Sequence, residues 1–465
     1  MMFFPMEKIN WYIDEAPEGE AYVLTRLEQN DNSINLTAGL VDDIHRPDSI
    51  VLEYVDEKET ELAMGRLLYR ALARDTGITP PWGILTGIRP VKLFREQMSG
   101  AENAEKVFHD EFLVSPAKTE LAKRTEVYER AILEQNRPMD FSLYVSIPFC
   151  PTRCHYCSFV SHGIEQARKL MPQYLETLHK ELMDTAAIAK ELGLRLTTVY
   201  FGGGTPTTLS HQELDLLMGW VERYFDLSHL QEYTVEAGRP DTITKEKLQV
   251  IRSHGAGRIS VNPQTFHDNV LQNIGRGHTV QQFMDSYSIA RAMDFDCINI
   301  DLIAGLPGDD LKGFCHSVDS AIALDPENIT LHTLSIKRAA GLGSADVHTL
   351  QKEYSMAVDM VDYGYRALDK SGYHPYYLYR QRNTAGNLEN TGFAKEGKDG
   401  RYNVYIMAET QTILAAGAGA ATKAVHPITG EVMRVYNHKY PYEYIGRYDE
   451  LRERKQQLHD FFKYK

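Results

Sequence analysis

The stretch LYVSIPFCPTRCHYCSF (residues 143–159) joins a strand-like apolar run to a loop that holds three cysteines. From here to about residue 333, short apolar runs alternate with longer helical stretches, as in repeated βα units around a parallel sheet. The helical stretches at 170–192 and 211–225 have apolar residues at helical spacing, and Ser210 is the expected N-cap of the second. We count six strand-like runs, at residues 143–149, 197–203, 232–238, 258–262, 297–305 and 329–335. This pattern predicts a βα barrel, complete or partial, with its chemistry at the C-terminal ends of the strands.

We place the barrel core at residues 136–340. The two regions that flank it have a different pattern of expected strands and helices. Residues 1–135 begin with a strand-rich part and continue through an amphipathic helix, so we expect a separate N-terminal α/β accessory domain. Residues 341–465 open with a long helix, pass through a Tyr- and Gly-rich region and end in a charged helix, which indicates a C-terminal α+β extension. The three expected helices lie at residues 57–77, 351–372 and 447–464.

The composition of the chain limits which kinds of binding partner are expected. The 465 residues are 43% hydrophobic and 25% charged, which is typical of a globular protein. Fifty basic against 64 acidic residues give a net charge of −14, so there is no diffuse attraction for nucleic acid, and we expect no nucleic-acid partner. No apolar run approaches the roughly 20 residues that a membrane span needs, and the first residues lack the apolar core of a signal peptide. We expect a cytosolic protein.

Five cysteines occur, and three of them lie within eight residues, a distribution that favours metal binding over disulfides. Cys150, Cys154 and Cys157 form the spacing CxxxCxxC, which can wrap one cubic 4Fe-4S cluster. Three ligands leave one iron open to a small chelating molecule. The alternatives are zinc or buried thiols, but a three-cysteine loop without a nearby fourth ligand fits structural zinc poorly. Cys297 and Cys315 lie on strand and helix patterns and are expected in the core.

This spacing, with YVSIPFC before it, resembles the radical S-adenosylmethionine (SAM) superfamily, whose cluster reduces SAM to a 5'-deoxyadenosyl radical. More narrowly, residues 141–425 resemble the oxygen-independent coproporphyrinogen III dehydrogenases and their heme-chaperone relatives, because YFGGGTP, EAGRP, NPQTF, NIGRGH and DLIAGLP follow in that order. The N-terminal extension and the sequences EAGRPDTIT and YRQRNTAGNLEN are similar to those of the HemZ-like branch. The resemblance implies a radical SAM βα barrel, complete or partial, with a 4Fe-4S cluster and SAM as cofactors.

The resemblance also implies which residues contact SAM. The glycine run 202–204 follows the second strand, where missing side chains allow a ligand to approach the backbone. Four polar residues fall at or after strand ends and supply acceptors for hydroxyls and an amine, plus one guanidinium for a carboxylate; barrel-rim salt bridges are the alternative. The implied SAM contacts are Tyr144, Tyr156, Gly203, Gly204, Thr205, Glu236, Gln264, Arg276, Asp301 and Ser335, with Ala421 as a further match.

The substrate implied by the family is a tetrapyrrole. Coproporphyrinogen III carries four propionates, so its site needs a wide apolar opening with cations at the edge. The implied reaction converts two propionates to vinyl groups with loss of carbon dioxide and yields protoporphyrinogen IX. The electron donor expected for a low-potential cluster is a flavodoxin or ferredoxin. Candidate side chains for the tetrapyrrole are Arg239, Arg258, Lys337, Arg338, Arg380 and Arg382 with Tyr373, Tyr376, Tyr377 and Tyr379.

Two departures from the family pattern keep three functions open. Phe159 stands where the dehydrogenases carry a fourth cysteine, as it does in the heme chaperones. RYNVYIM (401–407) lacks the histidine of the chaperones' HN segment, and the chaperones lack a long N-terminal domain. The first hypothesis is a tetrapyrrole-directed dehydrogenase. The alternatives are a heme-binding chaperone and a radical SAM enzyme that modifies heme itself.

Overall fold

The computed structural model describes residues 3, 10, 12–13, 17, 19–31, 33–53, 56–100, 103–157, 162–163, 168–335, 347–381 and 384–463. The chain divides into two compact units. The first comprises Met1–Glu126, Ser335–Val358 and Leu378–Asn390, and the second comprises Val127–Leu334, Asp359–Tyr377 and Thr391–Lys465. The domain boundaries at residues 135 and 340 stay a prediction.

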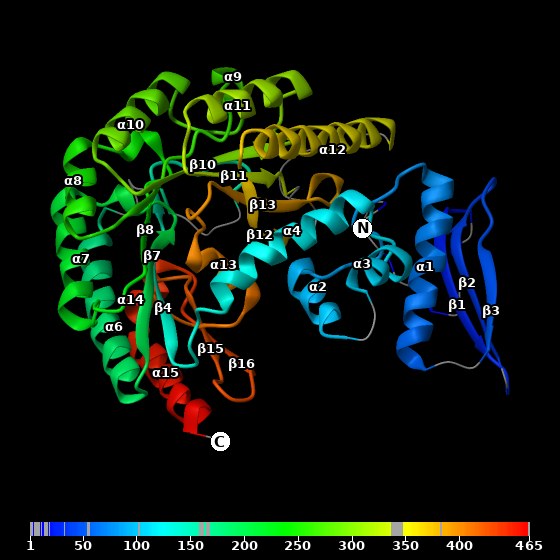
Figure 1. Ribbon diagram of the computed structural model, residues 1–465, viewed down its shortest axis with the longest axis horizontal. Coiled ribbons are helices and arrows are strands. Elements are labelled where there is room, and N and C mark those ends of the chain that lie inside the picture. Colours follow the sequence, from blue (N-terminus) through cyan, green and yellow to red (C-terminus); the bar gives the residue numbers. More distant parts are fainter. Residues whose placement is uncertain are drawn as a thin grey trace. The chain divides into compact units, whose positions relative to one another are not determined.

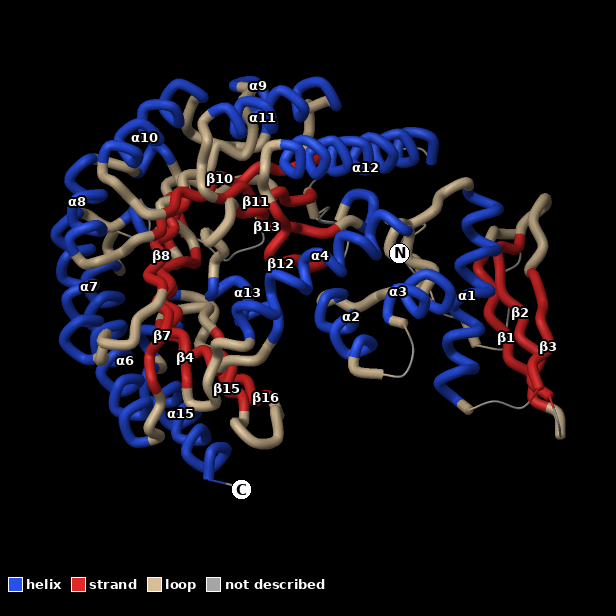
Figure 2. Tube along the Cα trace, in the orientation of Figure 1, coloured by secondary structure: helices blue, strands red, loops and turns tan. Residues whose placement is uncertain are grey.

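The first unit contains a three-stranded antiparallel sheet with helix α1 (Glu57–Thr76) against one face (Figure 2). The helix begins where the Asp56 side chain accepts a hydrogen bond from the Glu59 N–H, and it ends at Gly77, whose φ of +69° suits glycine. Apolar side chains of α1 pack on alternate residues of β2, so the predicted helix at 57–77 is confirmed to within a residue. The unit's other elements are β1 (Tyr22–Gln29), β2 (Ser33–Val41), β3 (Asp48–Glu53), α2 (Pro90–Met98), α3 (Ala104–Lys106) and the π-helical turn Val107–Glu111, with α4 (Pro116–Leu133) leading into the second unit.

The largest sheet has eleven strands in the order β12-β13-β11-β10-β9-β8-β7-β4-β14-β15-β16. Its six central predicted strands are all present and each is parallel to the next. They are β4 (Asp140–Ile147), β7 (Arg195–Gly203), β8 (Glu232–Glu236), β9 (Arg258–Ser260), β10 (Cys297–Ala304) and β11 (Asn328–Thr333). Most of their residues are buried and the rest are half-buried, because helices cover one face and side chains fill the other.

Helices cover the outer face of these strands (Figure 1). The predicted helix at 211–225 forms α7, and Ser210 caps it in a capping box with Glu213, as expected. The prediction at 170–192 is confirmed as α6, with one residue fewer at each end. The helices of this layer are α6 (Met171–Glu191), α7 (His211–Tyr224), α8 (Lys245–Ser253), α9 (Asp268–Asn273), α10 (Val280–Ala292) and α11 (Leu311–Ala323), with α12 (Val347–Lys370) continuing after β11.

The C-terminal region extends the sheet at both ends. β14 (Thr412–Ala416) runs parallel to β4 and is a seventh parallel strand that the sequence analysis missed, whereas β13 (Glu389–Ala394) is antiparallel to β11. In the described part of the chain the sheet has two edge strands, β12 and β16. The predicted α/β fold with a partial βα barrel is confirmed: the structure is a mixed α/β fold built on a large parallel sheet. The remaining elements are β12 (His374–Arg380), β15 (Ala421–Val425), β16 (Val432–Tyr436), α13 (Arg401–Ala408), α14 (Pro441–Gly446) and α15 (Tyr448–Lys463).

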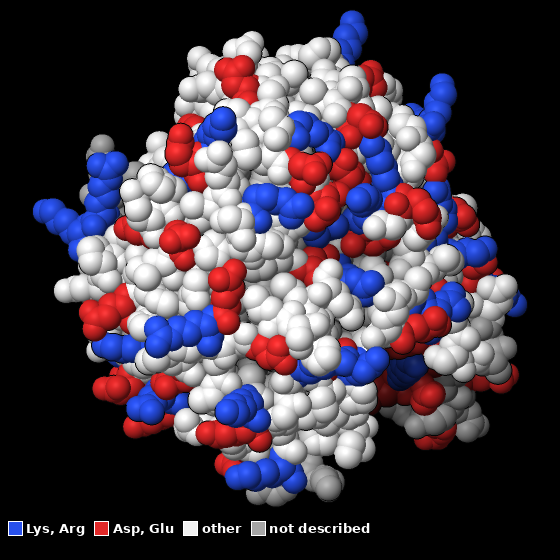
Figure 3. All heavy atoms as spheres, turned by 60° about the vertical axis from the view of Figure 1, so that its left-hand side comes forward, with Lys and Arg blue, Asp and Glu red and all other residues white. Residues whose placement is uncertain are grey.

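The surface shows mixed charge. On the face in Figure 3, lysine and arginine side chains are interspersed with aspartate and glutamate, so the described residues of this face carry no broad field of one sign. Among the described helices, none is both long enough and apolar enough to cross a membrane.

Candidate functional site

The three clustered cysteines lie in one loop beyond the C-terminal end of β4. Cys150 ends the short strand β5 (Phe149–Cys150), and the loop then turns so that the Cys157 N–H donates to the Cys154 carbonyl at 3.2 Å. Cys150 and Cys154 are buried and Cys157 is half-buried. The Cys150 Sγ lies 3.4 Å from the Thr205 Oγ1, at the end of the neighbouring strand β7. The thiols therefore sit at the strand ends, where chemistry is expected in this fold.

A second segment holds this loop in place. The His155 N–H donates to the Ile274 carbonyl at 3.0 Å, and its ring Nδ1 lies 3.1 Å from the Asn273 carbonyl. The Thr152 hydroxyl donates to the Gly275 carbonyl at 3.4 Å. These contacts all come from the NIGRGH motif, so this motif anchors the cysteine loop.

The cysteines suit an iron-sulfur cluster by their chemistry. Soft thiolates favour iron-sulfur clusters and zinc over hard oxygen-binding ions. Among the described residues, no three His, Cys, Asp or Glu side chains converge closely enough to hold one metal ion. A cubic cluster does not require such convergence, because each thiolate binds a different iron. Cys150, Cys154 and Cys157 thus form a donor set that fits a 4Fe-4S cluster with one iron left open.

The glycine run brings β7 against the strand that leads to the cysteines. A Cβ on Gly204 would lie 2.6 Å from the Phe149 carbonyl oxygen, and Gly203 has a φ of +105°, so both positions require glycine. The Gly204 N–H donates to Ile147 and the Thr205 N–H donates to Phe149, both at 2.8 Å. These two amides are committed within the protein, a role that the sequence analysis did not foresee.

Two carboxylates lie on strands β8 and β10, which are separated in the sheet by β9. Glu236 ends β8 and accepts a hydrogen bond from the Tyr200 hydroxyl. Asp301 in β10 accepts from Asn262 Nδ2 and from Asn299 Nδ2, both at 2.7 Å, and lies 3.6 Å from the His332 Nε2. Glu236 is thus at the end of its strand, whereas Asp301 is in the middle of β10, and the two carboxyl groups are near enough for the charge of Asp301 to act on Glu236.

The carboxyl groups of Glu236 and Asp301 differ in their protonation near neutral pH. Burial raises the pKa of Glu236 to about 7, and the negative charge of Asp301 adds to the rise. Burial acts on Asp301 in the same direction, but hydrogen bonds from His332 and Asn299 outweigh it and lower its pKa. Asp301 is therefore an acceptor only, whereas Glu236 can also donate a hydrogen bond.

Replacing Glu236 with glutamine is expected to stabilise the cofactor-free protein at high pH. A buried carboxyl with a raised pKa binds more protons when folded than when unfolded, so its destabilising effect grows as pH rises from 4.5 to about 7. A Glu236→Gln variant should gain up to about 3 kcal/mol at about pH 8 and much less at about pH 5. Thermal melting of both proteins at the two pH values measures this; equal gains at both would contradict it.

Gln264 and Arg276 are also buried at this end of the barrel. Gln264 has a φ of +70°, an uncommon conformation for a residue with a side chain, and its backbone exchanges hydrogen bonds with β10 at 3.0 Å. The Arg276 Nε donates to the Tyr156 hydroxyl at 3.2 Å, and its Nη1 donates to the Gly238 carbonyl at 3.4 Å. Arg276 therefore joins the cysteine loop to the loop that follows β8. Burial raises the pKa of Tyr156, which stays a neutral phenol.

A stack of tyrosines lies beside Glu236. Tyr144 and Tyr200 face each other across β4 and β7, with ring centroids 6.2 Å apart. Tyr402 from α13 lies 4.3 Å from the Tyr200 ring and 6.0 Å from the Tyr144 ring. Only Tyr144 was identified from sequence. Tyr402 comes from the RYNVYIM segment, whose placement in the barrel depends on tertiary packing.

The remaining candidates are placed by backbone pairing or lie outside the described residues. Ser335 belongs to the first unit, where it pairs with Thr384. Ala421 begins β15 and pairs with Tyr436. Lys337, Arg338, Arg382 and Phe159 lie outside the described residues.

The structure does not support the described arginines as propionate ligands. Arg239 is buried against Asp241, Arg258 is bonded to Asn328 and to the Lys398 carbonyl, and Arg380 donates to the Leu85 carbonyl. Of the tyrosine candidates, Tyr373, Tyr376 and Tyr377 are also buried. The Tyr373 hydroxyl donates to the Pro326 carbonyl and Tyr376 bonds Asn403, so packing accounts for both.

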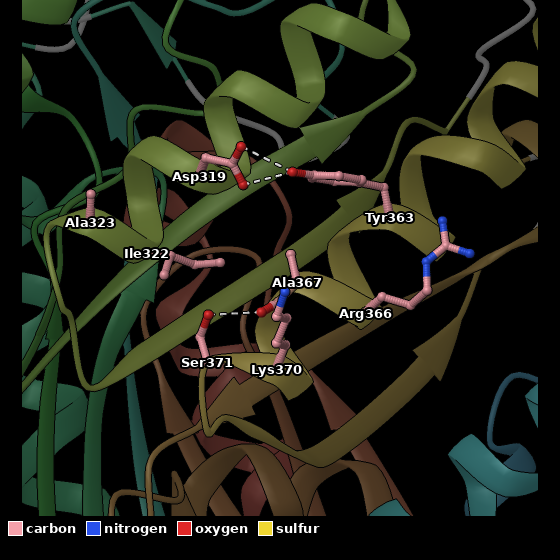
Figure 4. Close-up of a pocket in the computed structure, with 8 residues that line it drawn as sticks. All are labelled: Asp319, Ile322, Ala323, Tyr363, Arg366, Ala367, Lys370 and Ser371. Carbon is pink, nitrogen blue, oxygen red and sulfur yellow. Dashed lines mark hydrogen bonds between the residues drawn. The ribbon is translucent and has the colours of Figure 1, made fainter.

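A pocket of about 460 Å³ lies between the outer helices α11 and α12 (Figure 4). Tyr363 and Asp319 point toward each other in it, and the phenol donates to both carboxylate oxygens at 2.8 and 2.9 Å. The pocket includes none of the strand-end residues described above. It is therefore separate from the cysteine site.

The chain is similar to several known proteins of one superfamily. The family model of the radical SAM superfamily matches residues 144–321. The oxygen-independent coproporphyrinogen-III oxidase-like protein HemZ of Bacillus subtilis is 39% identical over 86% of this chain and 81% of HemZ. The heme chaperone HemW of Bacillus subtilis is 32% identical over 65% of this chain and 77% of HemW. Among solved structures, coproporphyrinogen III oxidase HemN of Escherichia coli shares the fold, with a TM-score of 0.53 and 22% identity over 70% of this chain and 72% of HemN.

Proposed function

The chain belongs to the radical SAM superfamily, in the HemZ-like branch related to the HemW heme chaperones, and on this premise we propose that it is an enzyme of anaerobic heme biosynthesis. The family uses a 4Fe-4S cluster and SAM. The proposed reaction is the oxidative decarboxylation of two coproporphyrinogen III propionates to vinyl groups, giving protoporphyrinogen IX. The observation that carries this proposal is the 39% identity to HemZ over 81% of its length, together with an intact cysteine loop.

The proposed roles follow from residue chemistry. Cys150, Cys154 and Cys157 hold the cluster and leave one iron for SAM. Asp301 is suited to accept hydrogen bonds from hydroxyl or amino groups, and Arg276 to bind a carboxylate. Glu236, half-buried with its pKa near neutrality, can accept or donate. The full proposed set of SAM contacts is Tyr144, Tyr156, Gly203, Gly204, Thr205, Glu236, Gln264, Arg276, Asp301 and Ser335.

The protein contributes to this reaction by positioning the substrate. Each conversion removes a hydrogen atom from a propionate β-carbon and one electron, and releases carbon dioxide as the vinyl group forms. When bound, the cluster and SAM supply the hydrogen abstraction. Tyr402 is buried and the other tyrosines and carboxyls of the site are half-buried, which limits the access of water, and the substrate must be held with one β-carbon in reach. A flavodoxin or ferredoxin as electron donor and a cytosolic location are parts of the proposal.

Two observations favour a heme chaperone as the second candidate. Several relatives are named heme chaperones, and Phe159 occupies the position of the dehydrogenases' fourth cysteine. A chaperone would bind heme stoichiometrically and pass it to an acceptor protein, with little SAM turnover. A radical SAM enzyme that modifies heme would consume SAM only when heme is present.

The deciding experiment supplies each candidate substrate to the reconstituted protein. Cluster-loaded protein is incubated without oxygen with SAM, a strong reductant and either coproporphyrinogen III or heme, and products are separated with mass detection. We expect loss of two carbon dioxide units from coproporphyrinogen III together with 5'-deoxyadenosine. SAM cleavage with an unchanged porphyrinogen would overturn the dehydrogenase, and stoichiometric heme uptake would then support the chaperone. A Cys154→Ala protein, treated identically, controls for chemical turnover.

A further inference from the structure

Arg239 follows β8 and is 3% exposed. Its Nε donates to Asp241 Oδ1 at 2.9 Å and its Nη2 donates to Oδ2 at 2.7 Å, so the carboxylate accepts two hydrogen bonds from one edge of the guanidinium. This two-bond geometry fixes the plane and the direction of the guanidinium group. Asp241 therefore determines where the third nitrogen, Nη1, points.

That third nitrogen faces the cysteine loop. The Arg239 Nη1 donates to the Thr152 carbonyl at 3.2 Å and to its hydroxyl at 3.1 Å, and it lies 3.6 Å from the Cys154 Sγ. A positive charge with an N–H directed at sulfur thus stands next to one of the three thiols. A buried ion pair gives little net stability compared with apolar packing, so stability alone does not explain its placement here.

We propose that Arg239, oriented by Asp241, is a positioning residue that hydrogen-bonds the Cys154 sulfur and raises the reduction potential of the cluster. The inference rests on the proposed assignment of the cluster to Cys150, Cys154 and Cys157. Reduction adds a negative charge to the cluster, and an adjacent cation and N–H···S bond favour the reduced form. Nothing in the role of Arg239 requires contact with the substrate.

Two single variants should shift the potential in opposite directions. Arg239→Gln removes the cation and the bond to sulfur, so the midpoint potential should fall. Asp241→Asn removes the compensating negative charge and leaves the cation beside the loop, so the potential should rise. Anaerobic redox titration followed by electron paramagnetic resonance reads the midpoint without reference to enzyme activity.

Arg291→Gln is the matched control. Arg291, on α10 in the same unit, also pairs with a carboxylate: its Nη1 donates to both oxygens of Glu327, at 2.8 and 2.9 Å, and no described contact joins it to the three clustered cysteines. Its loss should leave the midpoint potential unchanged. A shift as large as that of Arg239→Gln would show a general effect of lost charge and overturn the inference.

The remaining outcomes separate this inference from the cluster assignment. Unchanged potentials in both variants, or shifts in the same direction, would mean that the pair only anchors the loop. Should Arg239→Gln fail to retain iron, Asp241→Asn decides alone, and an unchanged or lowered potential would overturn the inference. If the unaltered protein assembles no 4Fe-4S cluster, the proposed function falls with it; a normal cluster with unmoved potentials refutes only the role of Arg239.

Discussion

Replacing Cys154 with alanine will leave the protein folded but unable to retain a 4Fe-4S cluster, and SAM cleavage will fall by about 100-fold or more. Two thiolates cannot hold the cubic cluster that three support. Cys154 is buried and its loop is anchored by His155 and Thr152 independently of the sulfur, so the backbone should keep its course. Iron and sulfide content, the cluster's visible absorbance and 5'-deoxyadenosine yield measure the effect.

Cys297→Ala is the control for this prediction. Cys297 is also buried, in β10, and its thiol donates to Asn328 Oδ1 at 2.8 Å, away from the cysteine loop. The control should keep a full complement of iron and lose only some stability, since it removes a buried sulfur and one hydrogen bond. Full iron content in Cys154→Ala, or cluster loss in Cys297→Ala, would refute the assignment.

Local patterns were sufficient to predict most of the barrel. The six strands were predicted because each is a short apolar run bounded by turn residues, and the observed ends differ by a few residues. α7 was predicted to its capping residue, because Ser210 precedes a run of apolar residues at helical spacing, and the structure adds the capping box with Glu213. The long helices predicted at 351–372 and 447–464 are α12 and α15, with ends displaced by one to four residues.

Features that depend on contacts between distant segments were missed. β14 has only five residues, and it becomes a barrel strand because it pairs with β4, more than 250 positions earlier. Tyr402 reaches the tyrosine stack in the same way, through α13. Arg239 was interpreted as a substrate cation, because sequence gives its charge but not the direction of its guanidinium, which Asp241 sets.

Replacing Glu181 with alanine is expected to destabilise the second unit by about 3–5 kcal/mol, since it leaves a buried lysine unpaired. Glu181 on α6 is fully buried and its Oε1 lies 2.6 Å from the Nζ of Lys455 on α15, itself 3% exposed. The same carboxylate accepts from the Gly417 N–H at 2.7 Å and from the Asn437 side chain at 2.8 Å. One group therefore joins α6, the end of β14 and the C-terminal helix.

The loss should also reach the cysteine loop. The Ser146 hydroxyl, near the end of β4, donates to the Ala418 carbonyl at 2.9 Å, next to the Gly417 that Glu181 holds. Glu181→Ala should therefore lower the denaturant midpoint and also speed the loss of iron, both measurable on one sample. Replacing the pair together, as Glu181→Leu with Lys455→Met, removes both charges and should recover much of the stability. A single variant within about 1 kcal/mol of the unaltered protein, or a double variant no better than the single, would show that the carboxylate does not hold the barrel together here.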